Sequence, residues 1–332
     1  MSVLMLGGTR FLGRRVAELL ISAGYEVIVA QRGRTGTPPD GARALTLDRA
    51  SGEGLDALGA LRPEAVIDLS GYQAGWVRDS LEALAGRAPH YLFVSSGAVY
   101  RPSAQLPWPE STPFGPSPTW GSYGDEKLAA ERALWEADRR GDVAVTVFRF
   151  PFILGPGNYA DREAFVCSRI AAGRPVLLPG GGNAVNQMLH VDDAARAIAA
   201  AVQQPDRSAG EAFNCGYHRG ITNRGFAELC AEVLGEMAQL IEIDERALGV
   251  ASPTVDLTDI VFPFPDQHYL LDVSRLRERL GVEAEIGNRR QLEQFVEAWV
   301  GSDEAAAGPR RYEREERALA ALRHHDTTRT HD

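Results

Sequence analysis

Short apolar runs alternate with longer amphipathic stretches over the first 150 residues of the chain. Runs of about four to six apolar residues, rich in β-branched side chains, are typical of parallel strands that helices cover on both faces. The longer stretches repeat apolar residues at helical spacing. The pattern therefore predicts a doubly wound α/β parallel sheet of Rossmann type. The predicted strands are 3–6, 26–30, 44–47, 65–69, 91–95 and 143–148, and the predicted helices are 11–23, 76–85 and 123–137.

The alternation is interrupted at residues 101–120, which are rich in proline, glycine and serine. A structureless stretch of this length is uncommon in a compact domain, so we expect a binding loop there. After residue 150 the pattern becomes less regular and predicts a smaller C-terminal substrate-binding lobe at the carboxyl edge of the sheet, where open α/β sheets bind ligands. The predicted helices of this part are 162–172, 192–202, 223–234 and 289–300, and its short strands lie near 176–178 and 212–214.

Three parts are expected along the chain. Residues 1–150 form a dinucleotide-binding domain to which parts of the later chain return, and residues 151–301 are mainly a substrate-binding lobe. Residues 302–332 are a charged tail with one helical patch at 312–323, expected to be a peripheral helix or disordered.

Composition and charge narrow the classes of partner. The 332 residues are 44% hydrophobic and 24% charged, as in an ordinary globular protein. No apolar run approaches the roughly 18 residues of a membrane span. The first strand begins almost at Met1 and leaves no room for a signal peptide, so a cytoplasmic protein is expected. The net charge of −10 opposes nonspecific binding to nucleic acid or to anionic membranes. Cys167, Cys215 and Cys230 fit neither a disulfide framework nor a metal site, and we expect no metal.

The stretch LGGTRFLG, residues 6–13, joins the first predicted strand to the first predicted helix. Gly7 and Gly8 permit a tight turn, and Gly13 lets the helix pack closely on the strand. Backbone N–H groups at the start of the helix then face a pyrophosphate. This context of strand, loop and helix predicts a dinucleotide site, although Arg10 stands where such a loop is expected to carry glycine.

The segment after the second strand favours NADP(H), with NAD(H) as the alternative. A cofactor with a free ribose 2′-hydroxyl usually meets an Asp or Glu about 20 residues after the glycine loop. This chain has Gln31, Arg32 and Arg34 there, and the planar guanidinium of arginine suits a 2′-phosphate. We expect Arg10 to turn toward the adenosine side and join Arg32 around that phosphate. Asp48, at the end of the third strand, is placed to accept from the adenine amino group or is a surface carboxylate.

Tyr123 and Lys127 lie four residues apart, on one face of a predicted helix. A tyrosine with a pKa of about 10 is a poor base at neutral pH, but a nearby ammonium favours the phenolate. Ser96, at the carboxyl end of the fifth strand, is placed to hydrogen-bond a substrate oxygen that changes between alcohol and carbonyl. A tyrosine–lysine pair alone is common on helix surfaces. Its order after a dinucleotide loop and a serine-rich strand end favours catalysis.

Together these motifs resemble those of the extended short-chain dehydrogenase/reductases, the NAD-dependent epimerase/dehydratase family, from the glycine loop to about Gly216. The sequences GGTRFLG and RGRT are similar to a less typical branch of that family, and LPWPESTPFG, RFPFILGPGN and LHVDDAARAI also fit. The resemblance implies that Tyr123 is the general acid/base, Lys127 its partner and Ser96 the aligned hydroxyl. It also implies that the backbone of 151–153 borders the nicotinamide. The predicted cofactor residues are Gly7, Thr9, Arg10, Phe11, Leu12, Gly13, Arg32, Arg34, Asp48, Leu69, Ser70, Ser95, Tyr123, Lys127, Pro151, Phe152 and Ile153.

Departures from the family pattern bear on the substrate. Phe152 stands where nucleotide-sugar epimerases carry a sugar-contacting asparagine, and Asn186 replaces an arginine that binds the diphosphate. Gly97 and Ala98 follow Ser96 where the sugar 4,6-dehydratases carry an Asp-Glu pair, so dehydration lacks its proton donor. We therefore expect an uncharged or modestly polar alcohol or ketone, of which a sugar-like molecule is one kind. The predicted substrate residues are Tyr72, Gly97, Trp108, Trp120, Phe152, Asn158 and Arg219, with His218 and 262–269 as further candidates, although each alone is more often ordinary packing. Glu110 and His190 fit the family pattern too, and we interpret both as structural.

The leading hypothesis is an NADP(H)-dependent oxidoreductase that moves a hydride between nicotinamide C4 and a secondary carbinol carbon. An epimerase uses the same residues to oxidise and re-reduce one carbon with a tightly held cofactor, and the sequence does not separate the two. A cofactor-sensing regulator or an RNA-binding relative is a further alternative. The tyrosine–lysine pair disfavours a non-catalytic regulator, and the net charge of −10 disfavours an RNA-binding protein. A homodimer is expected only by analogy with many relatives.

Overall fold

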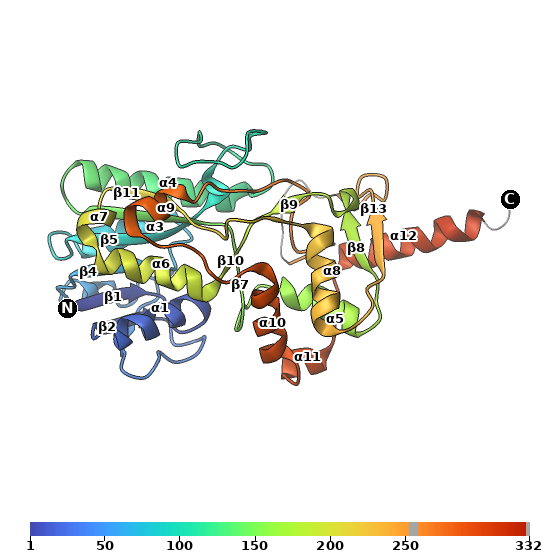
Figure 1. Cartoon of the computed structure of the whole chain (residues 1–332). Coiled ribbons are helices and arrows are strands. Elements are labelled where there is room, and N and C mark those ends of the chain that lie inside the picture. Colours follow the sequence, from blue (N-terminus) through green and yellow to red (C-terminus); the bar gives the residue numbers. More distant parts are fainter. Residues whose placement is uncertain (252–257, 330–332) are drawn as a thin grey trace. The chain divides into compact units, whose positions relative to one another are not determined.

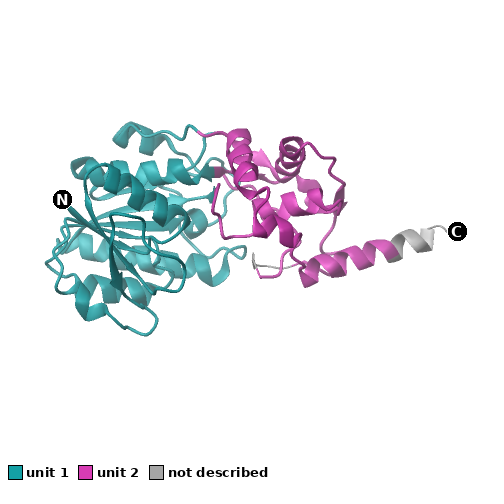
Figure 2. Ribbon diagram, turned by 90° about the horizontal axis from the view of Figure 1, so that it is seen from below, with its two compact units in different colours: residues 1–153, 189–218, 271–285 teal, residues 154–188, 219–270, 286–332 magenta. Residues whose placement is uncertain are grey.

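The computed structural model describes residues 1–251 and 258–329, which form two compact units (Figure 2). The first unit contains residues 1–153, 189–218 and 271–285. The second contains the described residues of 154–188, 219–270 and 286–332. The later chain thus returns twice to the first unit. Within the described ranges, no helix is long and apolar enough to cross a membrane.

The first unit is built on a seven-stranded sheet with the strand order β11-β6-β5-β4-β1-β2-β3 (Figure 1). All neighbouring strands in it are parallel. The order reverses between β1 and β4, and open α/β sheets bind ligands at the carboxyl ends of strands at such a switch point. The strands are β1 (Ser2–Leu6), β2 (Glu26–Gln31), β3 (Arg43–Thr46), β4 (Ala65–Asp68), β5 (His90–Ser96), β6 (Ala144–Phe150) and β11 (Glu211–Asn214).

Helices cover both faces of this sheet, as Figure 1 shows. Helices α1 (Phe11–Ser22) and α6 (Val191–Gln203) pack together on one face, and α3 (Ala74–Ala83) and α4 (Gly121–Arg139) on the other. Successive side chains of β1 enter opposite cores, which explains why Val3–Leu6 are apolar without interruption. The shorter helices of the unit are α2 (Leu55–Leu58), η1 (Gly97–Val99), α7 (Pro205–Ser208) and α9 (Ser274–Leu280).

The second unit combines helices with pairs of short strands. Strand β8 (Val176–Pro179) pairs with β13 (Leu240–Ile243), and β9 (Val185–Asn186) pairs with β12 (Ile221–Thr222). Strands β7 (Phe152–Leu154) and β10 (Met188–His190) form another short sheet, and most of their residues belong to the first unit. The helical elements are α5 (Glu163–Ala171), η2 (Gly180–Gly182), α8 (Asn223–Leu234), α10 (Asn288–Trp299), α11 (Asp303–Ala307) and α12 (Glu313–Arg329).

The six strands and three helices predicted for the first 150 residues are confirmed, with ends that differ by at most two residues. The helices show the helical period and the strands are short apolar runs, so the local pattern suffices to find them. In the second unit the strand predicted near 176–178 is confirmed as β8, whereas the other short strands there carry too few residues to show a pattern.

The charged tail differs from the prediction of a peripheral or disordered segment. Arg169 of α5 donates to both carboxylate oxygens of Glu315 at 2.5 and 2.6 Å, and both side chains are fully buried. Tyr312 and Ala318 are also buried. The beginning of α12 therefore belongs to the core of the second unit, because a distant cation neutralises one of its charges.

Candidate cofactor and catalytic site

The glycine loop between β1 and α1 leaves no room for side chains at the point where helix and loop meet. A Cβ atom on Gly13 would lie 2.7 Å from Cα of Gly8 and 3.0 Å from its nitrogen. Gly7 and Gly8 have φ values of 95° and 154°, which favour glycine. The chain thus forms the close strand–loop–helix approach that a dinucleotide pyrophosphate requires, and the residues present fit such a cofactor.

Helix α1 begins at Phe11, whose φ of 45° lies in the left-handed region. Arg10 precedes it with extended backbone, and neither Arg10 nor the first turn provides a side-chain cap or an acidic residue. A left-handed phenylalanine is uncommon and clusters at ligand sites. Nothing in the sequence signals this conformation, although Phe11 was among the predicted cofactor residues.

The loop after β2 packs against the glycine loop. Thr9 Oγ1 donates to the carbonyl of Thr35 at 3.0 Å. Arg32 and Arg34 are exposed on the loop after β2, and Arg10 is exposed on the glycine loop. Three predicted arginines therefore project from two loops in mutual contact, beside the start of α1.

Asp48 follows β3, and its carboxylate already has protein partners. Its Oδ1 accepts from the backbone of Ala50 at 3.0 Å, and Oδ2 lies 3.5 Å from a guanidinium nitrogen of Arg34. Leu69 and Ser70 follow β4 beside the glycine loop. Ser70 Oγ donates to the carbonyl of Leu6 at 3.0 Å, and this bond ties the end of β4 to the end of β1.

The loop after β5 holds the turn of α4 that carries Tyr123. A Cβ atom on Gly124 would lie 2.7 Å from the carbonyl oxygen of Ala98, so only glycine permits this approach. Ser96 caps η1 by accepting from the Ala98 backbone at 3.2 Å. Tyr123 is 40% exposed. The structure thus packs the helix turn with the predicted acid/base against the loop with the predicted serine.

Lys127 lies one turn after Tyr123 and is 2% exposed. Its Nζ donates to the carbonyl of Val94 at 2.8 Å and lies 4.8 Å from the ring centre of Phe93 and 5.1 Å from that of Tyr72. Burial lowers the pKa of Lys127 to about 8, although the negative charge of Asp68 opposes this shift. A pKa this close to neutral pH is unusual for a lysine and is typical of functional sites.

A buried ion pair beneath this lysine was not predicted. Arg49 donates to Asp68 at 2.6 and 2.9 Å, and Tyr91 donates to the same carboxylate at 2.7 Å. Asp68 is fully buried, and Arg49 holds its pKa below the usual value against the effect of that burial. The sequence offered one signal of this ion pair, an aspartate at the end of an apolar strand.

Ser95 points into a second buried ion pair. Its Oγ donates to Glu131 at 2.5 Å, and Glu131 accepts from Arg149 at 2.7 and 3.1 Å. Glu131 is 1% exposed, and the ion pair with Arg149 balances its charge inside the protein. The hydroxyl of Ser95 is engaged in this network, so a role of Ser95 toward the cofactor rests on its backbone.

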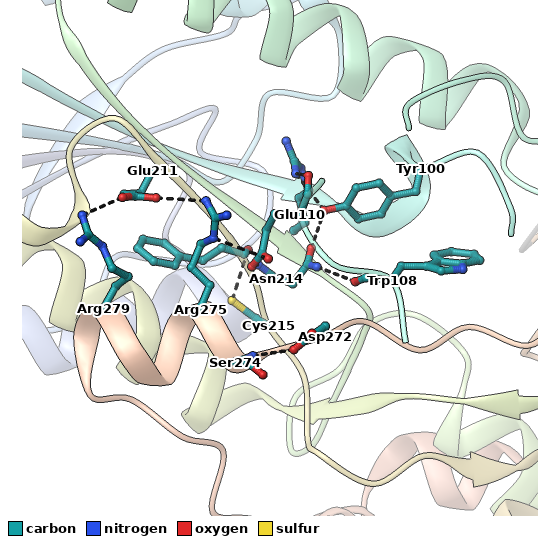
Figure 3. Close-up of polar contacts among 12 residues, drawn as sticks. Tyr100, Trp108, Glu110, Glu211, Asn214, Cys215, Asp272, Ser274, Arg275 and Arg279 are labelled. Carbon is teal, nitrogen blue, oxygen red and sulfur yellow. Dashed lines mark hydrogen bonds and ion pairs between the residues drawn. The ribbon is translucent and has the colours of Figure 1, made fainter. Parts of the chain in front are cut away.

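Trp108 differs from the expectation of a substrate contact. It is 2% exposed, and its Nε1 donates to the carbonyl of Ser103 at 3.0 Å. Asn214 donates to the carbonyl of Trp108 at 2.8 Å, and the Asn214 backbone donates to Glu110 at 2.8 Å (Figure 3). Trp108 and Glu110 thus fasten the 101–120 segment to the end of β11. For Glu110 this is the structural role that the sequence suggested. His190 likewise caps α6, where its Nδ1 accepts from the Asp192 backbone at 3.1 Å.

The other substrate candidates separate into two groups. In the first unit, Tyr72 is 45% exposed, Gly97 is buried in η1, and the rings of Trp120 and Phe152 lie 5.8 Å apart. Asn158 and Arg219 belong to the second unit. Asn158 donates to the buried Glu163 at 2.7 Å, so its amide orders its own loop.

The segment 262–269 also differs from the expectation of a pocket lining. Phe262, Phe264 and Tyr269 are at most 5% exposed and belong to the core of the second unit. Asn186, in the position of the family's diphosphate arginine, is fully buried and donates to Asn223 at 2.9 Å. Its amide therefore supports packing within that unit.

Comparison with known proteins places these observations in a family. The family model described as NAD dependent epimerase/dehydratase family matches residues 3–216. The chain is 34% identical over 205 residues to 2'-dehydrokanamycin reductase of Streptomyces kanamyceticus, which covers 59% of this chain and 56% of that protein. It is 28% identical over 299 residues to the chloroplast stem-loop binding protein of 41 kDa b of Arabidopsis thaliana, which covers 85% of this chain and 75% of that protein.

Solved structures share the fold. The UDP-glucose 4-epimerase of Thermotoga maritima with UDP-glucose matches with a TM-score of 0.76 at 23% identity, over 90% of this chain and 98% of that one. The UDP-glucose 4-epimerase of Thermus thermophilus with NAD matches with a TM-score of 0.73 at 22% identity, over 91% of this chain and 100% of that one.

Proposed function

Because the chain belongs to the NAD dependent epimerase/dehydratase family, we propose that it is an NAD(P)-dependent oxidoreductase. Its substrate is a secondary alcohol or ketone of a small molecule, and sugar-like molecules are within this class. The observation that carries the proposal is the junction of α4 with the loop after β5, where Gly124 meets Ala98. That junction supports joint action of Tyr123 and Ser96 on one substrate oxygen.

Each site residue has a distinct role in this proposal. Ser96 donates a hydrogen bond to the substrate oxygen, and the hydroxyl of Tyr123 delivers the proton to it during reduction or removes it during oxidation. The positive charge of Lys127, four residues along the same helix, favours the phenolate form of Tyr123. A bound nicotinamide cofactor supplies or accepts the hydride.

NADP(H) is the proposed cofactor. Arg32 and Arg34 are exposed on a loop in contact with the glycine loop, where a carboxylate for a ribose 2′-hydroxyl is usually found. Arg10 belongs to the same edge. Guanidinium groups form paired hydrogen bonds with phosphate oxygens, and this supports a preference for the 2′-phosphate.

Two features bear on the substrate class. Tyr72, Trp120 and Phe152 supply aromatic surface in the first unit. In the sequence, Asn186 stands where the resembled nucleotide-sugar epimerases carry a diphosphate-binding arginine. Both features favour a small uncharged ketone over a nucleotide sugar. The similarity to a protein named 2'-dehydrokanamycin reductase supports reduction as the reaction.

The central test is Tyr123→Phe, assayed by NADPH oxidation with a panel of cyclic and sugar-derived ketones. Loss of the proton donor should lower kcat by about 10²- to 10⁴-fold and leave NADPH affinity unchanged. The matched control is Tyr25→Phe, which removes a tyrosine hydroxyl just before β2, at the opposite edge of the sheet. Near-normal turnover by Tyr123→Phe would remove this residue from the mechanism.

Cofactor choice is tested separately with Arg32→Asp. The ratio of NADH to NADPH dissociation constants should fall by about tenfold or more, because a carboxylate repels the 2′-phosphate and accepts from a 2′-hydroxyl. Arg62→Asp is the control, since Arg62 is an exposed arginine before β4. An unchanged ratio in Arg32→Asp contradicts the proposed role of the arginines.

Two alternatives keep specific support. Membership of the epimerase/dehydratase family leaves room for epimerisation by the same residues, which recycles the cofactor, so net NADPH consumption distinguishes reduction from it. The similarity to a stem-loop binding protein favours RNA binding. Titration with a short RNA stem-loop at several salt concentrations tests this, because binding through phosphates weakens steeply with salt.

A further inference from the structure

Lys127 is the only lysine among the 35 lysine and arginine residues of the chain. Arginine supplies all other fixed positive side chains, on the surface and in buried ion pairs alike. Arginine stays charged in proteins, whereas the charge of a buried lysine responds to its surroundings. The groups around Lys127 therefore decide whether this site carries a cation.

Charged and titratable groups face Lys127 from several elements. On α4 itself, Tyr123 lies one turn before it, and Glu131 one turn after it is neutralised by Arg149. The segment after β4 contributes the Tyr72 ring. A further contribution is the Asp68 cluster, which consists of Arg49 from the segment after β3, Asp68 at the end of β4 and Tyr91 near the start of β5.

The Asp68 cluster is adjacent to the ring on which Lys127 rests. Asp68 and Phe93 are paired across β4 and β5, so their side chains share the α4 face of the sheet. A Cβ atom on Gly71 would lie 2.7 Å from the Phe93 ring and 2.9 Å from the Asp68 carboxylate. Lys127 Nζ lies 4.8 Å from the centre of the same ring. The Asp68 carboxylate and the Lys127 ammonium therefore both lie close to the Phe93 ring.

We propose that Asp68 is a positioning residue that keeps Lys127 charged beside Tyr123, with Arg49 and Tyr91 holding its carboxylate in place. The role rests on the proposed function of Tyr123, but the electrostatic link between Asp68 and Lys127 does not. Asp68 has its own hydrogen bonds, from Arg49, Tyr91 and the Ser70 backbone, and acts on Lys127 through space. In a buried site a nearby negative charge favours the ammonium, and the charge of Asp68 raises the pKa of Lys127 whereas that of Arg49 lowers it.

Lysine labelled with ¹³C provides a direct test, because the chain gives a single lysine signal. The chemical shift of that signal is followed from pH 6 to pH 11 in the full chain without substrate. Asp68→Asn removes the negative charge and should lower the measured pKa of Lys127. Arg49→Gln removes the opposing positive charge and should raise it. These opposite signs separate electrostatics from general damage, which moves both variants in one direction.

Two further variants keep the test decisive if a single substitution prevents folding. The double variant Arg49→Gln/Asp68→Asn leaves no unpaired buried charge, and its pKa for Lys127 should lie below that of the wild type but above that of Asp68→Asn. Glu315→Gln breaks a buried ion pair in the second unit and should leave the lysine titration unchanged.

The pH profile of ketone reduction gives the functional readout. In Asp68→Asn, the alkaline loss of kcat/KM should begin at lower pH, with a decrease of about tenfold at pH 8. If no ketone is reduced by the wild type, the proposed function fails while the titration still tests the link. Equal pKa values of Lys127 in the wild type and the folded Asp68 variants overturn the inference.

Discussion

A single methyl group on Gly13 should disturb the cofactor loop more than any surface change. In Gly13→Ala the new Cβ atom would lie 2.7 Å from Cα of Gly8, whereas carbon atoms in ordinary contact are about 3.5–4.0 Å apart. The start of α1 must therefore move by roughly 1 Å from the loop that receives the pyrophosphate. Overpacking of this kind costs about 1–3 kcal/mol, and the gain in helix propensity returns about 0.5–1 kcal/mol.

The net expectation for Gly13→Ala is a loss of about 1 kcal/mol in the free energy of unfolding and a clear loss of cofactor affinity. Weakening one backbone hydrogen bond to a charged phosphate costs about 1.5–3 kcal/mol, which corresponds to at least tenfold in the dissociation constant. Urea denaturation measures the first quantity, and fluorescence titration with NADPH measures the second.

Gly75→Ala is the matched control, because Gly75 also lies in the first turn of a helix but has no atom within 4 Å of its added Cβ. Its stability and NADPH affinity should equal or slightly exceed those of the wild type. If Gly13→Ala behaves like Gly75→Ala in both assays, the close helix–loop contact has no role in cofactor binding and the reasoning is refuted.

Two further predictions concern buried carboxyl groups of the second unit, and urea denaturation measures both. Glu315→Gln leaves Arg169 buried without a counter-charge and should lower the free energy of unfolding by about 3–5 kcal/mol. In the control Glu316→Gln the side chain is 37% exposed and paired with Arg174, so the loss should be under about 1 kcal/mol. Equal losses in the two variants contradict this account. Burial raises the pKa of Glu163 from 4.5 to about 7, so the folded chain binds this proton more tightly than the unfolded chain. The contribution of Glu163 to stability is therefore greatest at low pH and is lost as the pH rises through 7. Relative to Glu163→Gln, the wild type should lose about 3 kcal/mol between pH 4.5 and pH 8, and a pH-independent difference would show that the carboxyl is not perturbed.

The sequence alone determined the features that depend on local spacing. Apolar runs and helical repeats located the seven strands of the sheet and the longer helices α1, α3, α4 and α6 of the first unit, because each element must bury its own face. Gly13 and the Tyr123–Lys127 spacing were also visible, since a glycine after a strand and two residues one turn apart have local geometric consequences. These signals sufficed for the fold and for the catalytic hypothesis.

Only the tertiary structure decided which polar residues are paired inside the molecule. Arg169 and Glu315 are 146 positions apart, and no local pattern joins them. The burial of Trp108 was equally inaccessible, because this residue lies in an irregular loop whose backbone is bound by Asn214 from a distant strand. In our proposal the charge of Lys127, on helix α4, likewise depends on Asp68 of strand β4, since electrostatic effects follow distance in space rather than distance along the chain.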